Sequence, residues 1–220
     1  TTICPKIIQG GMGAGVSNWR LAQAVSANGQ LGVVSGTALD NIMIRRLQDG
    51  DTDGSIRHAL THFPFPKIAQ KIINNYFIKG GKAPDVPYKT SVSHSLEHSQ
   101  SQQELYTAAN FVEVFLARQG HSNPVGINYL EKIQLPHLAS IYGAILAGVA
   151  VIIVGAGIPL EMPEIISRLS RHEPVKYQIK VHDAPTDYHA YTTFNPADFN
   201  DDGQTQTSMP KPAFLPIVSS

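Results

Sequence analysis

The sequence predicts an α/β protein in which buried parallel strands alternate with helices. Short runs of consecutive apolar residues recur along the chain, and such runs are typical of strands that are covered on both faces. The segments between them carry apolar residues at helical spacing and capping residues at their ends. Because strands and helices alternate, we expect right-handed crossovers and a parallel sheet.

Five apolar runs are the predicted strands, and each of them ends in small or polar residues. The carboxyl ends of parallel strands lie at one edge of a sheet, which is where ligands bind in α/β folds. We therefore expect the residues after the runs, GGMG, SGT, NY, GAG and SS, to surround a ligand pocket at that edge. The runs are 6–9, 31–34, 124–127, 151–154 and 214–218.

The first two helices are predicted from the residues at their ends. Ser17 is a suitable N-cap for a helix over 18–28, and Gly29 closes that helix because glycine readily adopts the left-handed conformation of a C-cap. Asp40 and Gly50 bracket the second helix.

The later helices have similar signals. Ser101 and Glu104 have the spacing of a capping box, which predicts a helix that begins there and ends at Gly120. Pro136 and Pro163 each lie near a predicted helix start, where the missing N–H of proline costs nothing.

Three segments interrupt the alternation of strands and helices. Residues 79–101 are rich in Gly, Pro, Ser and His, and we expect them to form a long loop insertion. Residues 175–182 alternate strictly between apolar and polar, which predicts a half-exposed strand outside the buried sheet. Residues 200–212 are polar and are expected to form the loop that leads into the last strand.

Composition excludes several classes of protein. The 17 Lys and Arg residues balance 17 Asp and Glu residues, and a protein that binds nucleic acid usually carries an excess of positive charge. The single cysteine, Cys4, excludes an internal disulfide framework and a multi-cysteine zinc site. The N-terminal residues lack the pattern of a signal peptide, so we expect a cytoplasmic protein.

One apolar stretch, 143–159, is long enough to resemble a membrane span. Gly148 divides it into a first half with helical spacing and a second half rich in β-branched residues. A helix, a glycine and a buried strand account for this pattern better than a spanning helix, so we expect no membrane partner.

Two histidine patterns resemble metal motifs. His94 to His98 matches the H-x-x-E-H string of some zinc proteases, but that motif needs a helix and this segment is a Ser-rich loop. His58 and His62 are four residues apart without a glutamate between them, and a solvated helix face is the simpler interpretation. We therefore predict no metal site.

Two glycine-rich segments follow predicted strands. Residues 10–15, GGMGAG, lie between a strand and a helix but do not fit the G-x-G-x-x-G or P-loop patterns. Such a backbone can lie flat against a planar ligand, and the alternative is that the glycines only form a tight strand-to-helix turn. Residues 155–159, GAGIP, are a weaker second case.

Four of these segments, 6–13, 31–35, 126–128 and 155–159, resemble the nitronate monooxygenase family, formerly called 2-nitropropane dioxygenase. Relatives of that family include FMN-dependent enoyl-ACP reductases and the reductase partners of polyunsaturated fatty acid synthases. The sequence of residues 128–136 resembles that of one subgroup of the family. The resemblance covers most of the chain in the same order and excludes only 65–103.

The resemblance implies a (β/α)8 TIM barrel that binds FMN non-covalently at the carboxyl ends of its strands. In the family the first glycine-rich turn lies along the flavin ring, and the asparagine after the third strand bonds to the ribityl or phosphate region. The resemblance implies more loosely that one residue after the second predicted strand and two residues after the fourth line the cofactor pocket. The implied cofactor-binding residues are Gly10, Gly11, Met12, Ser35, Asn128, Gly155 and Gly157.

The resemblance also implies that the chain is incomplete. The family's catalytic histidine lies in a Gly-Gly-His motif on a later strand, and this sequence contains no such motif. A complete barrel needs about 250 residues, whereas five predicted strands already occupy these 220. We therefore expect residues 1–220 to be the N-terminal part of a barrel, and we assign no catalytic residue. Whether a Gly-Gly-His motif follows Ser220 in the gene product is the single observation that would test this expectation best.

The implied function is an FMN-dependent oxidoreductase that oxidises an alkyl nitronate with O₂ to a carbonyl compound and nitrite. One alternative is an enoyl-thioester reductase that uses the same flavin and NAD(P)H. An alternative of another class is a ligand-binding module without turnover. The sequence does not decide the substrate or the oligomeric state.

Overall fold

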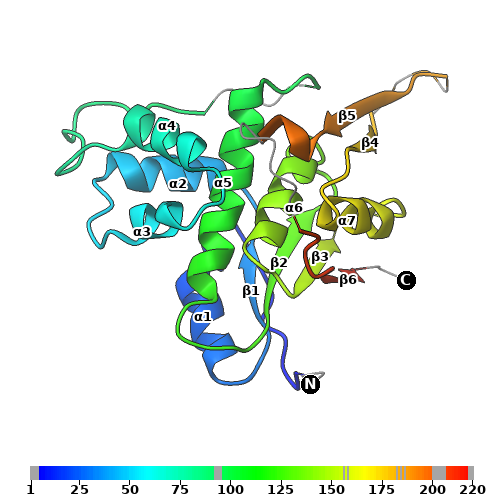
Figure 1. Ribbon diagram of the computed structural model, residues 1–220, viewed down its shortest axis with the longest axis horizontal. Coiled ribbons are helices and arrows are strands. Elements are labelled where there is room, and N and C mark those ends of the chain that lie inside the picture. Colours follow the sequence, from blue (N-terminus) through cyan, green and yellow to red (C-terminus); the bar gives the residue numbers. More distant parts are fainter. Residues whose placement is uncertain are drawn as a thin grey trace.

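The computed structural model describes residues 5–91, 96–155, 157, 159–181, 183, 185, 187–199 and 207–217, and it confirms an α/β fold with a parallel sheet (Figure 1). Helices pack against a four-stranded sheet, and a separate two-stranded sheet contacts α6 and α7. In chain order the elements are α1 (Trp19–Ala27), β1 (Gly32–Ser35), α2 (Leu39–Gln48), α3 (Ser55–Thr61), α4 (Pro66–Tyr76), α5 (Gln100–Ala117), β2 (Val125–Leu130), α6 (His137–Leu146), β3 (Val151–Gly155), α7 (Met162–Ser170), β4 (Val175–Ile179), β5 (Ala190–Phe194), a 3₁₀ turn (Pro196–Phe199) and β6 (Ala213–Pro216).

The parallel sheet follows the order of the chain. Its strands lie in the order β1-β2-β3-β6, and each strand pairs in parallel with the next strand of the sheet along the chain. The first predicted strand, 6–9, contributes only an isolated parallel bridge between Ile8 and Leu31. That prediction is therefore too long, although the segment lies where a fifth parallel strand would begin.

The helices cover one face of this sheet. Strand side chains alternate between faces, so Val34, Ile127 and Ile152, which are opposite one another in register, all point into the main helix-covered core. The other face carries a small cluster of Leu31, Val33 and Ile153, and no helix residue of the described chain belongs to it. The sheet is thus covered by helices on one side only, unlike a doubly wound sheet.

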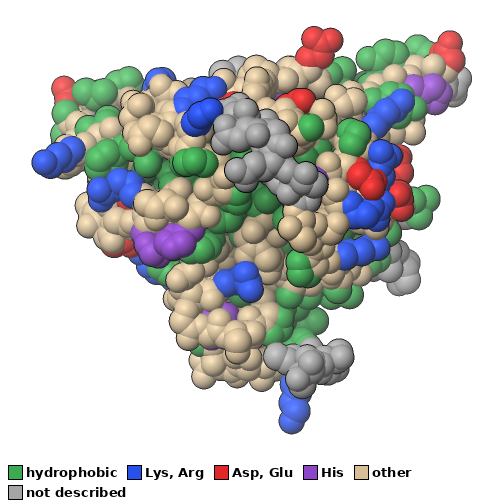
Figure 2. All heavy atoms as spheres, viewed as in Figure 1, with side chains coloured by type: hydrophobic (Ala, Val, Ile, Leu, Met, Phe, Trp, Pro, Cys, Tyr) green, Lys and Arg blue, Asp and Glu red, His purple; other side chains and the backbone are tan. Residues whose placement is uncertain are grey.

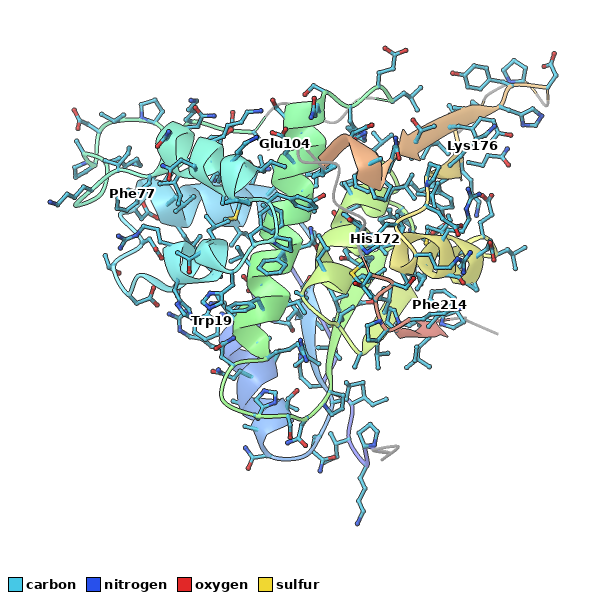
Figure 3. All side chains as sticks on the ribbon, viewed as in Figure 1. Trp19, Phe77, Glu104, His172, Lys176 and Phe214 are labelled. Carbon is cyan, nitrogen blue, oxygen red and sulfur yellow. The ribbon has the colours of Figure 1, made fainter. Side chains whose placement is uncertain are left out.

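The long helix α5 is the centre of the helical layer. It packs against α1, α2, α3 and α6, and Figure 3 shows Phe77 after α4 and Lys176 of β4 on opposite sides of it. Contact with α6 is especially close at Gly143, where an added Cβ would lie 2.8 Å from the backbone carbon of Thr107. The Thr107 hydroxyl also donates a hydrogen bond to the carbonyl oxygen of Ala139.

Two predicted caps are wrong by one or two residues. Asn18, not Ser17, caps α1 by accepting hydrogen bonds from the N–H groups of Arg20 and Leu21. Helix α5 begins two residues before the predicted position, because Ser99 and Gln102 form the capping box. Ser99 and Gln102 have the same spacing as the predicted pair, Ser101 and Glu104. The type of cap was therefore predicted correctly, but its position was wrong by two residues.

The irregular segments are held by specific contacts. Within 79–91 and 96–99 the structure describes no helix or strand, and Lys89 is tied to the Gln48 side chain through two hydrogen bonds. The predicted strand at 175–182 is shorter, Val175–Ile179, and pairs antiparallel with β5 outside the parallel sheet. The described part of the polar loop at 200–212 has no regular structure, while 200–206 and His182 lie outside the described residues.

The apolar stretch at 143–159 divides as predicted. It contains the end of α6, a turn in which Gly148 adopts φ of +76°, and then β3. Among the described residues, no helix is both long and apolar enough to cross a membrane.

Candidate functional site

The carboxyl edge of the parallel sheet brings together three of the predicted site residues. Ser35 at the end of β1 lies opposite Asn128 of β2 in the register. The Asn128 side-chain amide donates a 2.8 Å hydrogen bond to the carbonyl oxygen of Gly11. The Asn128 carbonyl oxygen accepts a 2.8 Å bond from the N–H of Gly36. The first glycine-rich loop is therefore fastened to the ends of β1 and β2.

This loop is a tight turn organised by Ser17. The Ser17 hydroxyl accepts a hydrogen bond from the N–H of Met12 and donates one to the carbonyl oxygen of Gly10. A Cβ on Gly11 would lie 2.8 Å from the carbonyl oxygen of Val34, so a glycine is needed there for packing. Gly10 and Met12 are exposed, and the Met12 side chain retains 66% of its accessible surface.

The Asn128 side chain has a buried acceptor without a partner. Its amide nitrogen bonds to Gly11, but its Oδ1 atom is buried and accepts no hydrogen bond from the described residues. A buried carbonyl oxygen that accepts nothing costs free energy of about 1–3 kcal/mol. The Oδ1 atom of Asn128 is therefore an unsatisfied acceptor at this edge of the sheet.

The two later glycines lie further along the same edge. Gly155 is opposite Leu130 in the register, two residues beyond Asn128 on β2, and an added Cβ there would approach the Ile217 side chain at 3.2 Å. Gly157 packs on Glu131, whose Cβ would be 2.6 Å from an added methyl group. Gly157 thus needs glycine because the Glu131 side chain is too close for a Cβ, whereas at Gly155 the end of the Ile217 side chain would have to shift slightly.

A buried carboxylate that the sequence did not single out anchors the two-stranded sheet to this edge. Glu131 follows β2 and is only 4% exposed. The Tyr177 hydroxyl of β4 lies 2.7 Å from both carboxylate oxygens of Glu131, and the Gln134 amide and the Lys180 ammonium lie at 3.2 Å and 3.6 Å. Burial, and then the hydrogen bond to Glu131, raise the pKa of Tyr177, so its hydroxyl stays a donor.

Replacing Tyr177 with phenylalanine is expected to lower the free energy of unfolding by about 2 kcal/mol, because the buried Glu131 loses a charge-assisted hydrogen bond. Urea denaturation of both proteins measures this difference. The matched control is Tyr191→Phe on the neighbouring strand, where the side chain is 39% exposed and little change is expected. Equal effects of the two substitutions would show that Glu131 does not anchor the hairpin.

A small cavity lies on the helix side of the same strand ends. It has a volume of about 90 Å³ and is lined by Asp40, Tyr106, Tyr129, His137 and Ser140 among others. His137 is 1% exposed, and its Nε2 atom donates to the carbonyl oxygen of Leu130 at 3.1 Å. Burial lowers the pKa of His137 to about 4, so the ring is neutral at pH 7. None of the seven predicted site residues lines this cavity.

The part of the chain that the structure describes contains no cluster of three or more His, Cys, Asp or Glu side chains suited to a metal ion. Residues 96–98 of the H-x-x-E-H string precede α5 instead of lying in a helix, and His94 lies outside the described residues.

No protein-family model matches this chain, and no curated protein matches it either. The chemistry of the edge therefore has to be judged from its residues. The seven predicted side chains contain no ionisable group, so they can orient a ligand through backbone groups and the Asn128 amide but cannot accept a proton at neutral pH.

Proposed function

We propose that this chain is the N-terminal part of an FMN-dependent (β/α)8-barrel oxidoreductase and that the enzyme oxidises alkyl nitronates. The observation that carries the proposal is the buried, unpartnered Oδ1 of Asn128 beside the glycine-rich loop, at the sheet edge where barrel enzymes bind ligands. The resemblance to nitronate monooxygenases supplies the cofactor and the reaction.

The strand order supports a barrel over a doubly wound sheet. A doubly wound sheet reverses its strand order and has helices on both faces, whereas these parallel strands follow chain order with helices on one face. Among the described residues, no strand extends the sheet beyond β6, and only the isolated bridge at Ile8 lies beyond β1. The exposed Ile8 lies at one end, and Leu215 and Ile217, at 41% and 53% exposure, lie at the other. Further strands would cover these apolar side chains and remove the open edges.

The residues at this edge fit a flavin in part. Gly10 and Met12 are exposed, and the Oδ1 atom of Asn128 is a hydrogen-bond acceptor without a partner. Gly11, Gly155 and Gly157 have a different role, because their missing side chains make room for Val34, Ile217 and Glu131. We therefore assign binding to Gly10, Met12 and Asn128, and loop positioning to Gly11.

The chemistry that bound FMN supplies is electron transfer from the nitronate to O₂, which yields a carbonyl compound and nitrite. The protein's part at this edge is to orient the ligand. Ser17 holds the turn at Gly10 and Met12, and Asn128 ties that turn to the strand ends. Because no side chain of this group can act as a base at neutral pH, the proton acceptor must come from another part of the enzyme.

Replacing Asn128 with alanine is expected to weaken FMN binding by about tenfold, because a buried hydrogen bond is lost. The full-length gene product is purified, its visible spectrum is recorded and FMN is titrated by fluorescence quenching. Asn74→Ala on the exposed face of α4 is the matched control and should leave the affinity unchanged.

A colourless protein that takes up no added FMN would reject the proposal. If FMN binds, steady-state assays with a nitronate and O₂ and with an enoyl thioester and NADPH separate the two candidate reactions. FMN binding without either activity would favour the alternative of a ligand-binding module.

A further inference from the structure

His58 and His62 lie together on one exposed face of the α3 helix. His58 is in α3 and His62 is its C-cap residue, and both side chains are exposed. Figure 2 shows histidine side chains gathered on this surface over α3. The two ring centroids are 4.8 Å apart at an interplanar angle of 66°. The pair is thus a contact between two imidazoles, and this structural fact is independent of the proposed flavin chemistry.

Hydrogen bonding sets the tautomer of His62. Its Nδ1 atom lies 3.0 Å from the carbonyl oxygen of His58, and a carbonyl oxygen can only accept, so Nδ1 carries the proton. The Nε2 atom is then left with a lone pair. Histidines that bind metals are usually held in this way, by a hydrogen bond from the second ring nitrogen to a carbonyl or carboxylate oxygen. The Thr61 hydroxyl donates to the same carbonyl oxygen at 2.7 Å.

The Phe115 side chain of α5 packs against both histidine rings. It stacks on His62 with a centroid distance of 4.8 Å, and its ring lies 6.0 Å from that of His58. Packing against this aromatic side chain restricts both imidazoles before any ligand binds. Less conformational entropy is therefore lost when they bind one ion.

The separation of the rings suits two ligands of a single ion. A metal–nitrogen bond of about 2.0–2.1 Å puts an imidazole centroid about 3.2 Å from the metal. If one ring nitrogen of each histidine faces the same ion, two rings with centroids 4.8 Å apart subtend an angle of roughly 95–100° at that ion. This value lies between the angles of about 90° and about 109° for square-planar and tetrahedral coordination.

We propose that His58 and His62 form an open two-histidine site for a divalent first-row transition metal ion, with water in the remaining positions. No third His, Cys, Asp or Glu joins them in a metal-binding group within the described residues, so the site is not a closed structural centre. Imidazole ligands favour Cu²⁺ over Ni²⁺ and Zn²⁺, and the absence of carboxylate ligands disfavours Mg²⁺ and Ca²⁺.

The test is a Cu²⁺ titration of the intact chain, followed by electron paramagnetic resonance. The parent protein should show a copper signal with two imidazole nitrogens. His58→Asn and His62→Asn should each weaken this binding by about tenfold or more and reduce the signal to one nitrogen. His189→Asn is the control, because His189 is also exposed but lies in the loop before β5, remote in the sequence from α3.

Circular dichroism shows whether the variants fold, and substitution of exposed side chains is expected to leave the spectrum unchanged. Zn²⁺ should displace Cu²⁺ only at higher concentration, and a hundredfold excess of Ca²⁺ should not displace it. The proposal is overturned if the double variant His58→Asn with His62→Asn binds Cu²⁺ as tightly as the parent. It is equally overturned if the two-nitrogen signal persists in either single variant.

Discussion

Lowering the pH from 6.5 to 5 is expected to destabilise this protein by about 2 kcal/mol through His137 alone, and by about 3 kcal/mol when the pH reaches 4. Burial lowers the pKa of the folded ring to about 4 from an ordinary value of 6.5. Between these two values the unfolded chain binds a proton that the folded protein does not bind. The stabilisation is therefore complete above pH 6.5 and is lost as the pH falls toward 4.

The measurement is urea denaturation at several pH values for the parent and for His137→Gln. Glutamine can still donate to the carbonyl oxygen of Leu130 but does not titrate, so the variant should lack this part of the pH dependence. His189→Gln, which alters an exposed ring, should keep the parent's dependence. Parallel curves for the parent and His137→Gln would contradict the prediction.

Replacing Gly143 with alanine is expected to lower the free energy of unfolding by about 3 kcal/mol. Alanine is the better helix former by about 1 kcal/mol, so helix propensity alone predicts the opposite sign. The added methyl group, however, would overlap the carbonyl oxygen of Thr107, and neither helix backbone can move away cheaply. Overpacking should therefore outweigh propensity.

Thermal or urea denaturation measures this effect, with Gly10→Ala as the control. An added Cβ at Gly10 would meet only the Met12 side chain, at an ordinary contact distance of 3.5 Å. That variant should stay within about 0.5 kcal/mol of the parent. A stabilised Gly143→Ala protein would show that α5 and α6 can separate at this contact.

Local signals in the sequence predicted the parallel sheet well. The runs that became β1, β2 and β3 are apolar because these strands are covered in the fold, so the pattern carries the information directly. The run that became β6 is apolar too, although most of its residues are exposed. The division at Gly148 was predictable for a similar reason, because a residue that adopts positive φ is usually glycine. The caps of α1 and α5 were missed by one or two residues because neighbouring polar side chains can cap equally well.

Other elements were not predictable in this way. Helix α3 was predicted only as a solvated helix face carrying His58 and His62, without bounds. Helix α4 was not predicted, and it lies in the segment 65–103 that the family resemblance does not cover. Strand β5 was also missed. Its partner β4 is recognisable from the alternation of apolar and polar residues, whereas the pairing of β5 depends on a turn and a register that no local signal specifies.

The candidate site shows the same division between local and tertiary information. The glycines, Ser35 and Asn128 were selected because they lie in the segments that resemble the nitronate monooxygenase family, and the structure brings Gly11, Ser35 and Asn128 together. Whether these residues bind FMN stays a prediction. The buried pair of Glu131 and Tyr177 could not be predicted, because its members are 46 positions apart, one just after β2 and the other in β4 of the second sheet.

By itself, the sequence determined the class of the fold, the positions of the buried strands and the small residues that follow them, because hydrophobic periodicity and glycine are local consequences of burial and backbone conformation. Only the tertiary structure decided that helices cover one face of the sheet, that Asn128 keeps a buried acceptor without a partner, and that His58 and His62 meet over Phe115. The reason is that these properties depend on distances between residues that the chain brings together only when it folds.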